Sequence, residues 1–463
     1  MTVTLVSSFR ELLLSMAPVF TQPSYANFAA IVTGWVFCLG RHTVTNIIVA
    51  GGSDRKHYTC FHRFFNRAQW CLDALGRVVL MIALSFVPEG TTVLLAMDDT
   101  LCRKTGRHIW GAAMHHDQLR STSKRPAFSF GHSWVVLSVV IALPSITDRP
   151  VAIPFLFRLY RKKQKRRPPG RPKGERKCTG LATEREYRTR PQLAVELLEI
   201  AAGWLNGRDV RVVGDSEYSG GSISRHLPEN VDLFGRMPMD AALYAEPDER
   251  QPGQNGRPRK RGPRLLNPQH MAETRSPRWQ RERVAIYGRS VSVWFKTARA
   301  LWYNSAGTRP VFIVVVRDPS RRRRDDCFFT TDVDCPATEV LETIAKRWSL
   351  EVAFRDAKQS LGFEEPQSRN RLAVMRTAPC AVIIYSLTVL WYARCGHALR
   401  DTWFKTRPWY RSKKNTSFAD MLATLRQASW AEVSLFDPAQ GVGSDKVAEK
   451  RVLHLFTSLS MVS

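Results

Sequence analysis

The sequence predicts a mixed α/β fold, in which a core made of a mixed sheet with helices follows an α-helical N-terminal domain and is interrupted by an all-β insertion. Apolar residues recur at helical spacing up to about residue 88, strand-like runs begin near residue 91, and a helical pattern returns from Pro336. The predicted units are a helical domain (1–88), the first part of the core (89–239), a β-rich insertion (240–335), the second part of the core (336–400) and a basic, helical C-terminal region (401–463).

The N-terminal unit contains the apolar runs "FRELLLSMAPVF", "YANFAAIVTGWVFCLG" and "WCLDALGRVVLMIALSFV", each with helical spacing. A further stretch, "HYTCFHRFFNRAQW", combines basic and aromatic residues, which favours a DNA-binding bundle. The alternative is that Phe61, Phe64, Phe65 and Trp70 form the core of this unit.

The charge of the chain indicates a polyanionic partner. Its 463 residues include 69 Lys and Arg against 41 Asp and Glu, a formal net charge of +28. Such an excess favours nucleic acid as the partner. The basic residues occur in all regions instead of flanking one amphipathic segment, so no membrane partner is expected.

The cysteines and the longest apolar run point to a cytoplasmic protein. None of the nine cysteines forms a Cys-x-x-Cys pair, so we expect reduced and mostly buried thiols. Residues 378–393 are apolar except for Ser386 and Thr388, and this run is too short for a bilayer, which predicts a buried helix.

The first part of the core places acidic residues after two predicted strands. The runs "TVLLAMD", "HSWVVLSVVIALP" and "PVAIPFLFRLY" predict an antiparallel meander, "PQLAVELLEIAAGWL" a helix and "DVRVVGDSEYSGG" a fourth strand. Asp98 ends the first strand and Asp215 the fourth. One such Asp is an ordinary turn signal, but two in one sheet can converge on a cation.

Two basic segments are candidate DNA contacts. Residues 161–190 hold 13 Lys and Arg against three Glu, and the prolines and glycines of "PPGRPKG" predict an extended arm for the minor groove. The insertion carries basic loops, including "GRPRKRGPR" and "SRRRRDD". The alternative is that these are solvated surfaces. The candidate contacts are Lys162, Lys163, Arg166, Arg167, Arg171, Arg322 and Arg323.

A second polar strip marks the helix predicted around "KRWSLEVAFRDAKQSLGF". At 100° per residue, Arg347, Glu351, Arg355 and Lys358 fall within about 80° of one another, with apolar residues on both flanks. A buried strip of charge is costly, so it should face a cleft or pair internally. The cleft would hold a cation with Asp98 and Asp215, and the alternative is a salt-bridge ladder from Arg347 through Glu351 to Arg355.

These motifs resemble those of DDE transposases of the RNase H-like superfamily, in particular the transposases of bacterial insertion sequences of the IS4 and IS701 types. "MDDT" is similar to the first-Asp motif, and "GDSEY" matches the second, with Asp215 followed by Tyr218. Arg347, Glu351 and Lys358 fit the spacing of the third motif, whose Tyr position holds Ile344 here. The resemblance extends from about Asp98 to Phe363.

The resemblance implies an RNase H-like core with two Mg²⁺ or Mn²⁺ ions per active site. Asp98 would bridge the ions, and Asp215 and Glu351 would each hold one. Strand alternation points Asp99 to the opposite face, as a fallback ligand or a supporting residue. Arg347, Lys358, Arg355 and Tyr218 would contact DNA.

The function implied is cut-and-paste transposition. The partners would be double-stranded DNA, as terminal inverted repeats and as target, and a second copy in a homodimer that bridges two ends. The location would be the bacterial cytoplasm, at the nucleoid. Two alternatives stay open: an RNase H-like nuclease without strand transfer, and a domesticated or inactive transposase that only binds DNA.

Overall fold

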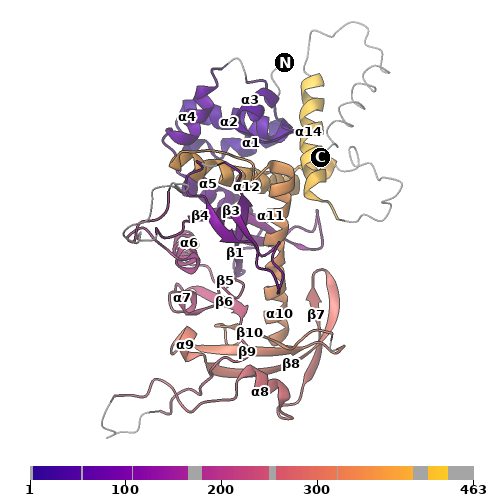
Figure 1. The fold of residues 1–463 in the computed structure, drawn as a ribbon. Coiled ribbons are helices and arrows are strands. Elements are labelled where there is room, and N and C mark those ends of the chain that lie inside the picture. Colours follow the sequence, from indigo (N-terminus) through magenta and orange to yellow (C-terminus); the bar gives the residue numbers. More distant parts are fainter. Residues whose placement is uncertain are drawn as a thin grey trace, which may run out of the picture.

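The structure, a computed structural model, describes residues 4–53, 56–106, 108–164, 180–249, 257–320, 322–399 and 415–435. One mixed sheet runs through the molecule (Figure 1). The N-terminal helices, the long helix α12 (Arg371–Arg394) and the helix α14 (Phe418–Leu435) gather at one end of it. The strands from β7 (Gln280–Ile286) to β10 (Asp326–Thr330) form the other end. The basic residues Arg166, Arg167 and Arg171 lie outside the described residues, as do residues 436–463.

The N-terminal unit is helical, as the sequence predicts. Pro23 lies in the first turn of α2, where its missing N–H costs no hydrogen bond, and the Thr43 side chain caps α3 by accepting from the Asn46 amide at 3.2 Å. The elements are α1 (Ser7–Leu14), η1 (Ala17–Val19), α2 (Gln22–Phe37), α3 (Val44–Ala50), α4 (Thr59–Asn66) and α5 (Leu72–Leu84).

The aromatic residues of this unit form its core. Phe61, Phe64, Phe65 and Trp70 are 1%, 1%, 2% and 7% exposed. Trp70 also stacks on Phe64 with ring centroids 5.0 Å apart. These rings are therefore unavailable to DNA, and a DNA-binding role of this unit remains a prediction for its surface alone.

Five strands make the core sheet, in the order β4-β3-β1-β5-β6. β1 pairs antiparallel with β3 and parallel with β5, and β5 pairs parallel with β6. This order and these directions are those of the RNase H-like fold that the sequence predicts. This part of the chain also contains the short strand β2 and the helices α6 and α7. The elements are β1 (Val93–Arg103), β2 (Ala113–His116), β3 (Phe128–Ala142), β4 (Pro150–Tyr160), α6 (Arg190–Trp204), β5 (Val210–Val213), α7 (Gly221–Ser224) and β6 (Val231–Arg236).

The environment of the central strand β3 explains why polar and apolar residues do not alternate in its sequence. Every residue from 131 to 141 is buried, because β3 is paired on both edges and covered on both faces. β2 pairs with the beginning of β3 and β4 with its later part, and the predicted three-strand meander is thus present with one added strand.

The predicted all-β insertion differs in the structure. Its strands continue the core sheet, because β10 pairs with β6 and is followed by β9, β8 and β7. Two short helices also occur in it, so it is neither all-β nor a separate sheet. The elements are α8 (Pro268–Glu273), β7 (Gln280–Ile286), β8 (Arg289–Leu301), α9 (Tyr303–Ala306), β9 (Pro310–Arg317) and β10 (Asp326–Thr330).

The last helices pack the sheet against the N-terminal unit. α12 is long and apolar enough to cross a membrane, but 89% of its apolar window is buried inside the protein, as expected of a core helix. Arg376 of α12 donates to the carbonyls of Phe65, Ala68 and Trp70 and so ties α12 to the N-terminal helices. The elements are α10 (Ala337–Lys346), α11 (Trp348–Leu361), α12 (Arg371–Arg394), η2 (Gly396–Leu399) and α14 (Phe418–Leu435).

Candidate active site

The register of two parallel strands brings Asp98 and Asp215 together. Ala96 of β1 lies opposite Val213 of β5, and the two aspartates each follow two residues later. Asp98 and Asp215 therefore lie side by side, each two residues beyond the last pair of the β1–β5 ladder. Asp98 is not at a strand end, as the sequence suggested, since β1 continues to Arg103 through its pairing with β3. Only its pairing with β5 ends there.

A tight turn holds Asp215. One of its carboxylate oxygens, Oδ1, accepts from the backbone amides of Glu217 at 2.8 Å and Tyr218 at 3.3 Å. Its carbonyl accepts from the Ser219 hydroxyl at 2.6 Å. This turn is the one Asp commonly forms, and it engages only one of the two carboxylate oxygens. The other oxygen, Oδ2, is therefore the one that a ligand could use.

Arg347 links the third carboxylate to the first. Its guanidinium donates to Asp98 through Nη1 and to Glu351 Oε1 through Nη2, the latter at 2.7 Å. Arg347 is the one residue between α10 and α11, so the single predicted helix is divided at this point. Half of the predicted salt-bridge ladder is thus present, but Arg355 pairs with Asp356 instead of completing it.

The negative charges of the neighbouring carboxylates disfavour one another in this buried site. Burial raises the pKa of Asp98 to about 8, Arg347 opposes this rise, and the charges of Asp215 and Asp99 add to it. Since the rise comes from burial and from neighbouring negative charge, a further cation placed here would oppose it.

Asp99 belongs to a separate network on the other face of β1, as strand alternation predicts. It accepts from the Ser133 hydroxyl at 3.0 Å and from the Tyr218 hydroxyl at 3.1 Å, and it pairs with Arg190 at 3.2 Å. Arg190 also reaches Glu217 at 3.3 Å. The network ties the Asp215 turn to β1 and α6, which gives Asp99 a supporting role.

Arg190, Ser133 and Glu217 were not predicted as site residues. A signal for Arg190 exists in "TRPQ", because Thr189 and Gln192 form a capping box that starts α6 at Arg190. Nothing in the sequence indicates that Ser133, inside a buried strand, faces Asp99.

Tyr218 corrects one prediction. Its side chain is fully buried and its hydroxyl is bonded to Asp99, so it cannot contact DNA in this arrangement. Burial raises the pKa of its phenol further above the usual range, which keeps it a neutral donor. The second motif thus uses its Tyr to position Asp99.

The two remaining residues of the strip differ in their contacts. Lys358 donates to the carbonyl of Leu101 at 2.8 Å and pairs with Glu364 at 3.0 Å, with its side chain 19% exposed. It supports the end of β1 instead of standing free for phosphate. Arg355 is 57% exposed and pairs with its neighbour Asp356 at 2.9 Å.

The other predicted DNA contacts lie away from this cluster. Lys163 is exposed and pairs with Glu184 at 2.7 Å, and Lys162 beside it is half-buried. Arg322 and Arg323 are exposed in the turn between β9 and β10. Ile344, in the Tyr position of the third motif, is half-buried and packs against the core, so no hydroxyl is offered there.

The chemistry of the donor set fits a hard divalent cation, although its geometry is that of an ion-pair network. Among the described residues, no three His, Cys, Asp or Glu side chains converge as a metal-binding group. Instead the Arg347 guanidinium stands between Asp98 and Glu351 as their counter-ion. Carboxylate oxygens are the ligands that Mg²⁺ and Mn²⁺ prefer, so Arg347 occupies the place where a cation would serve.

Arg347→Gln is therefore expected to bind Mn²⁺ more tightly than the wild type. Removing the guanidinium leaves Asp98 and Glu351 without their counter-ion, and a divalent cation then gains more by binding. Electron paramagnetic resonance of free Mn²⁺ measures the affinity. Arg355→Gln, which removes an exposed charge two turns along the helix, is the matched control. Equal affinities of Arg347→Gln and wild type would mean that Arg347 does not compete with the cation.

Comparison with known proteins gives one family match. A model of the family described as "DDE superfamily endonuclease" matches residues 15–291, more than half of the chain. The matched region contains Asp98 and Asp215 and ends before Glu351, whose inclusion rests on spacing and on its bond to Arg347. No curated protein sequence matches the chain.

Proposed function

Because the chain belongs to the DDE superfamily of endonucleases, we propose that it is a cut-and-paste DNA transposase. It would cleave at the terminal inverted repeats of a transposon and join the freed ends to target DNA. The observation that carries the proposal is that Asp98 and Asp215 lie side by side just beyond the last paired residues of the β1–β5 ladder, with Glu351 joined to Asp98 through Arg347.

In this proposal the carboxylates of Asp98, Asp215 and Glu351 would hold the metal. When bound, two Mg²⁺ or Mn²⁺ ions would activate water and stabilise the leaving 3′ oxygen. Arg347, released from the carboxylates, has a planar guanidinium suited to the scissile phosphate. Asp99, Arg190 and Tyr218 keep the Asp215 turn in register with β1, while Lys358 fixes the strand beyond Asp98.

Transposition requires that two DNA ends be held together, so we propose that a homodimer bridges them, in the bacterial cytoplasm at the nucleoid. The excess of basic residues supports DNA as the partner. The cysteines agree with this compartment, since those in the described part of the chain are free thiols.

Incubation with a supercoiled plasmid that carries the element's own ends tests the proposal. With Mg²⁺ we expect excision and joining to a second plasmid, and with EDTA only binding. Cleavage without joining would identify a nuclease without strand transfer. Binding alone, with Mg²⁺ or Mn²⁺ present, would identify a protein that has kept the fold and lost the chemistry.

Neutralising the exposed basic residues Lys163, Arg322 and Arg323 should weaken DNA binding and reduce its salt dependence. For each side chain that binds a phosphate, neutralisation should lower the slope of log affinity against log salt by about 0.9 on duplex DNA. Fluorescence anisotropy between low and moderate salt measures the slope. A slope equal to that of the wild type would show that these side chains are solvated surface.

A further inference from the structure

We propose that residues 257–264, the basic arm, bind the phosphate backbone of duplex DNA at a site separate from the carboxylate cluster. The arm reads "RPRKRGPR" and carries Arg257, Arg259, Lys260, Arg261 and Arg264 within eight residues. The inference rests on the proposed function, in which DNA is the substrate. It adds a second DNA-binding site at a distance from the carboxylate cluster.

The arm is held in place by its backbone. Gly262 donates to the carbonyl of Ala245 at 2.9 Å, and Ala245 donates back to Pro263 at 2.9 Å. The neighbouring Tyr244 exchanges two backbone hydrogen bonds with Leu301 at the end of β8, at 3.0 and 2.7 Å. The end of the arm at residues 262–263 is thereby fixed to the extended sheet, and Arg257, Arg259 and Lys260 lie just before this anchored part.

One arginine of the arm serves as its anchor. The Arg261 guanidinium lies 4.2 Å from the ring centroid of Tyr244 and 5.1 Å from that of Tyr303. Such cation–π contacts use its charge within the protein. Arg257, Arg259 and Lys260 are exposed and, among the described residues, form no ion pair.

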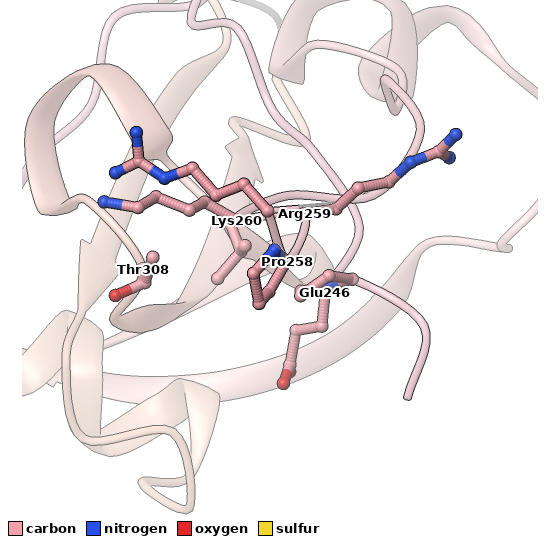
Figure 2. Close-up of a pocket in the computed structure, with 8 residues that line it drawn as sticks. Glu246, Pro258, Arg259, Lys260 and Thr308 are labelled. Atoms are coloured by element: carbon pink, nitrogen blue, oxygen red, sulfur yellow. The ribbon is translucent and has the colours of Figure 1, made fainter. Parts of the chain in front are cut away.

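These three residues border a cavity of about 420 Å³ that is also lined by Glu246, Leu301 and Thr308. Figure 2 shows the charged ends of Arg259 and Lys260 directed away from the Glu246 carboxylate. That carboxylate pairs with Arg299 at 3.1 Å and so does not neutralise the arm. The cavity therefore presents a net positive rim, which suits a phosphate group.

The strand order separates the arm from the carboxylates. Its support β8 is five strands from β1, across β5, β6, β10 and β9. At a spacing of about 4.8 Å per strand, this corresponds to roughly 24 Å. A ligand that reaches both sites must be long and carry regularly spaced negative charge. Duplex DNA, with one charge per about 1.7 Å of its axis, has both properties.

The test compares wild type with a variant carrying Arg257→Gln, Arg259→Gln and Lys260→Gln. Binding to a duplex of about 30 base pairs is measured by fluorescence anisotropy in EDTA over a range of salt. We expect weaker binding and a slope lower by up to about 2.7, from about 0.9 for each of three contacts. The matched control, Arg257→Lys with Arg259→Lys, keeps the charges and should keep the slope.

The melting temperature should not change, because these side chains are exposed and unpaired among the described residues. An unchanged slope in the folded Gln variant overturns the proposal, even if the wild type cleaves DNA. A lowered slope supports DNA binding by the basic arm, even if the wild type does not cleave DNA. In that case only the proposed transposase function would be wrong. If the triple variant does not fold, the single variant Arg259→Gln decides, with an expected decrease of about 0.9 in slope.

Discussion

Glu351→Gln is expected to lower Mg²⁺-dependent nicking by several orders of magnitude while the protein remains folded and still binds DNA ends. The amide keeps the size of the side chain and an oxygen for the Arg347 Nη2 donor, but it removes the negative charge that a hard cation requires. End binding should persist, because it depends on many Lys and Arg contacts. Plasmid nicking, thermal melting and end binding are measured on the same preparation.

A carboxylate on the same helix provides the control for this variant. Asp356 pairs with Arg355, outside the carboxylate cluster, so Asp356→Asn should leave nicking near the wild-type level. The salt-bridge interpretation of the Arg347–Glu351 pair predicts the reverse for Glu351→Gln, namely a lower melting temperature and intact nicking. With side chains 21% and 35% exposed, this partly solvated pair contributes on the order of 1 kcal/mol. Near wild-type nicking in the folded Glu351→Gln protein would remove Glu351 from the site.

Asp98→Asn and Asp99→Asn are expected to differ sharply although the residues are adjacent. Asp98→Asn should reduce nicking as much as Glu351→Gln, and the double variant should be little worse than either single one, because ligands of one site act as a unit. Asp99→Asn removes one of the two carboxylate partners of the half-buried Arg190 and should chiefly lower the melting temperature, with a smaller decrease in nicking.

Single-turnover nicking with excess protein, together with thermal melting, separates the two effects. Ser133→Ala, which removes one neutral donor to Asp99, is a milder control and should lower stability by about 1 kcal/mol. If Asp99→Asn reduced nicking as much as Asp98→Asn at an unchanged melting temperature, Asp99 would be a ligand and not a supporting residue.

Much of the fold could be predicted because periodicity changes clearly along the chain. The helices before residue 88, the meander of β1, β3 and β4, and the buried α12 follow from patterns of apolar residues. The continuation of the sheet through β10 could not be predicted, because strand patterns do not reveal which edge a strand will join.

The candidate site residues that could be chosen from the sequence are those marked by the spacing of residues along a strand or helix. Asp98 and Asp215 stand out because each follows an apolar run, and Glu351 because of its helical angle. In the structure, however, β1 continues beyond Asp98 and the predicted helix is divided at Arg347. The partners of Tyr218 and Lys358 could not be predicted, since a Tyr or Lys in a motif can serve equally as a ligand contact or as an internal support. Only the packing of α6 and α11 against the sheet decides between these roles.

Anomalous diffraction from crystals of the protein soaked in Mn²⁺ would locate a bound cation without relying on activity. We expect manganese peaks bounded by Asp98, Asp215 and Glu351, with the Arg347 side chain moved away from between Asp98 and Glu351. No peak at these carboxylates, with Arg347 still bonded to both Asp98 and Glu351 at saturating Mn²⁺, would contradict the assignment of a metal site here.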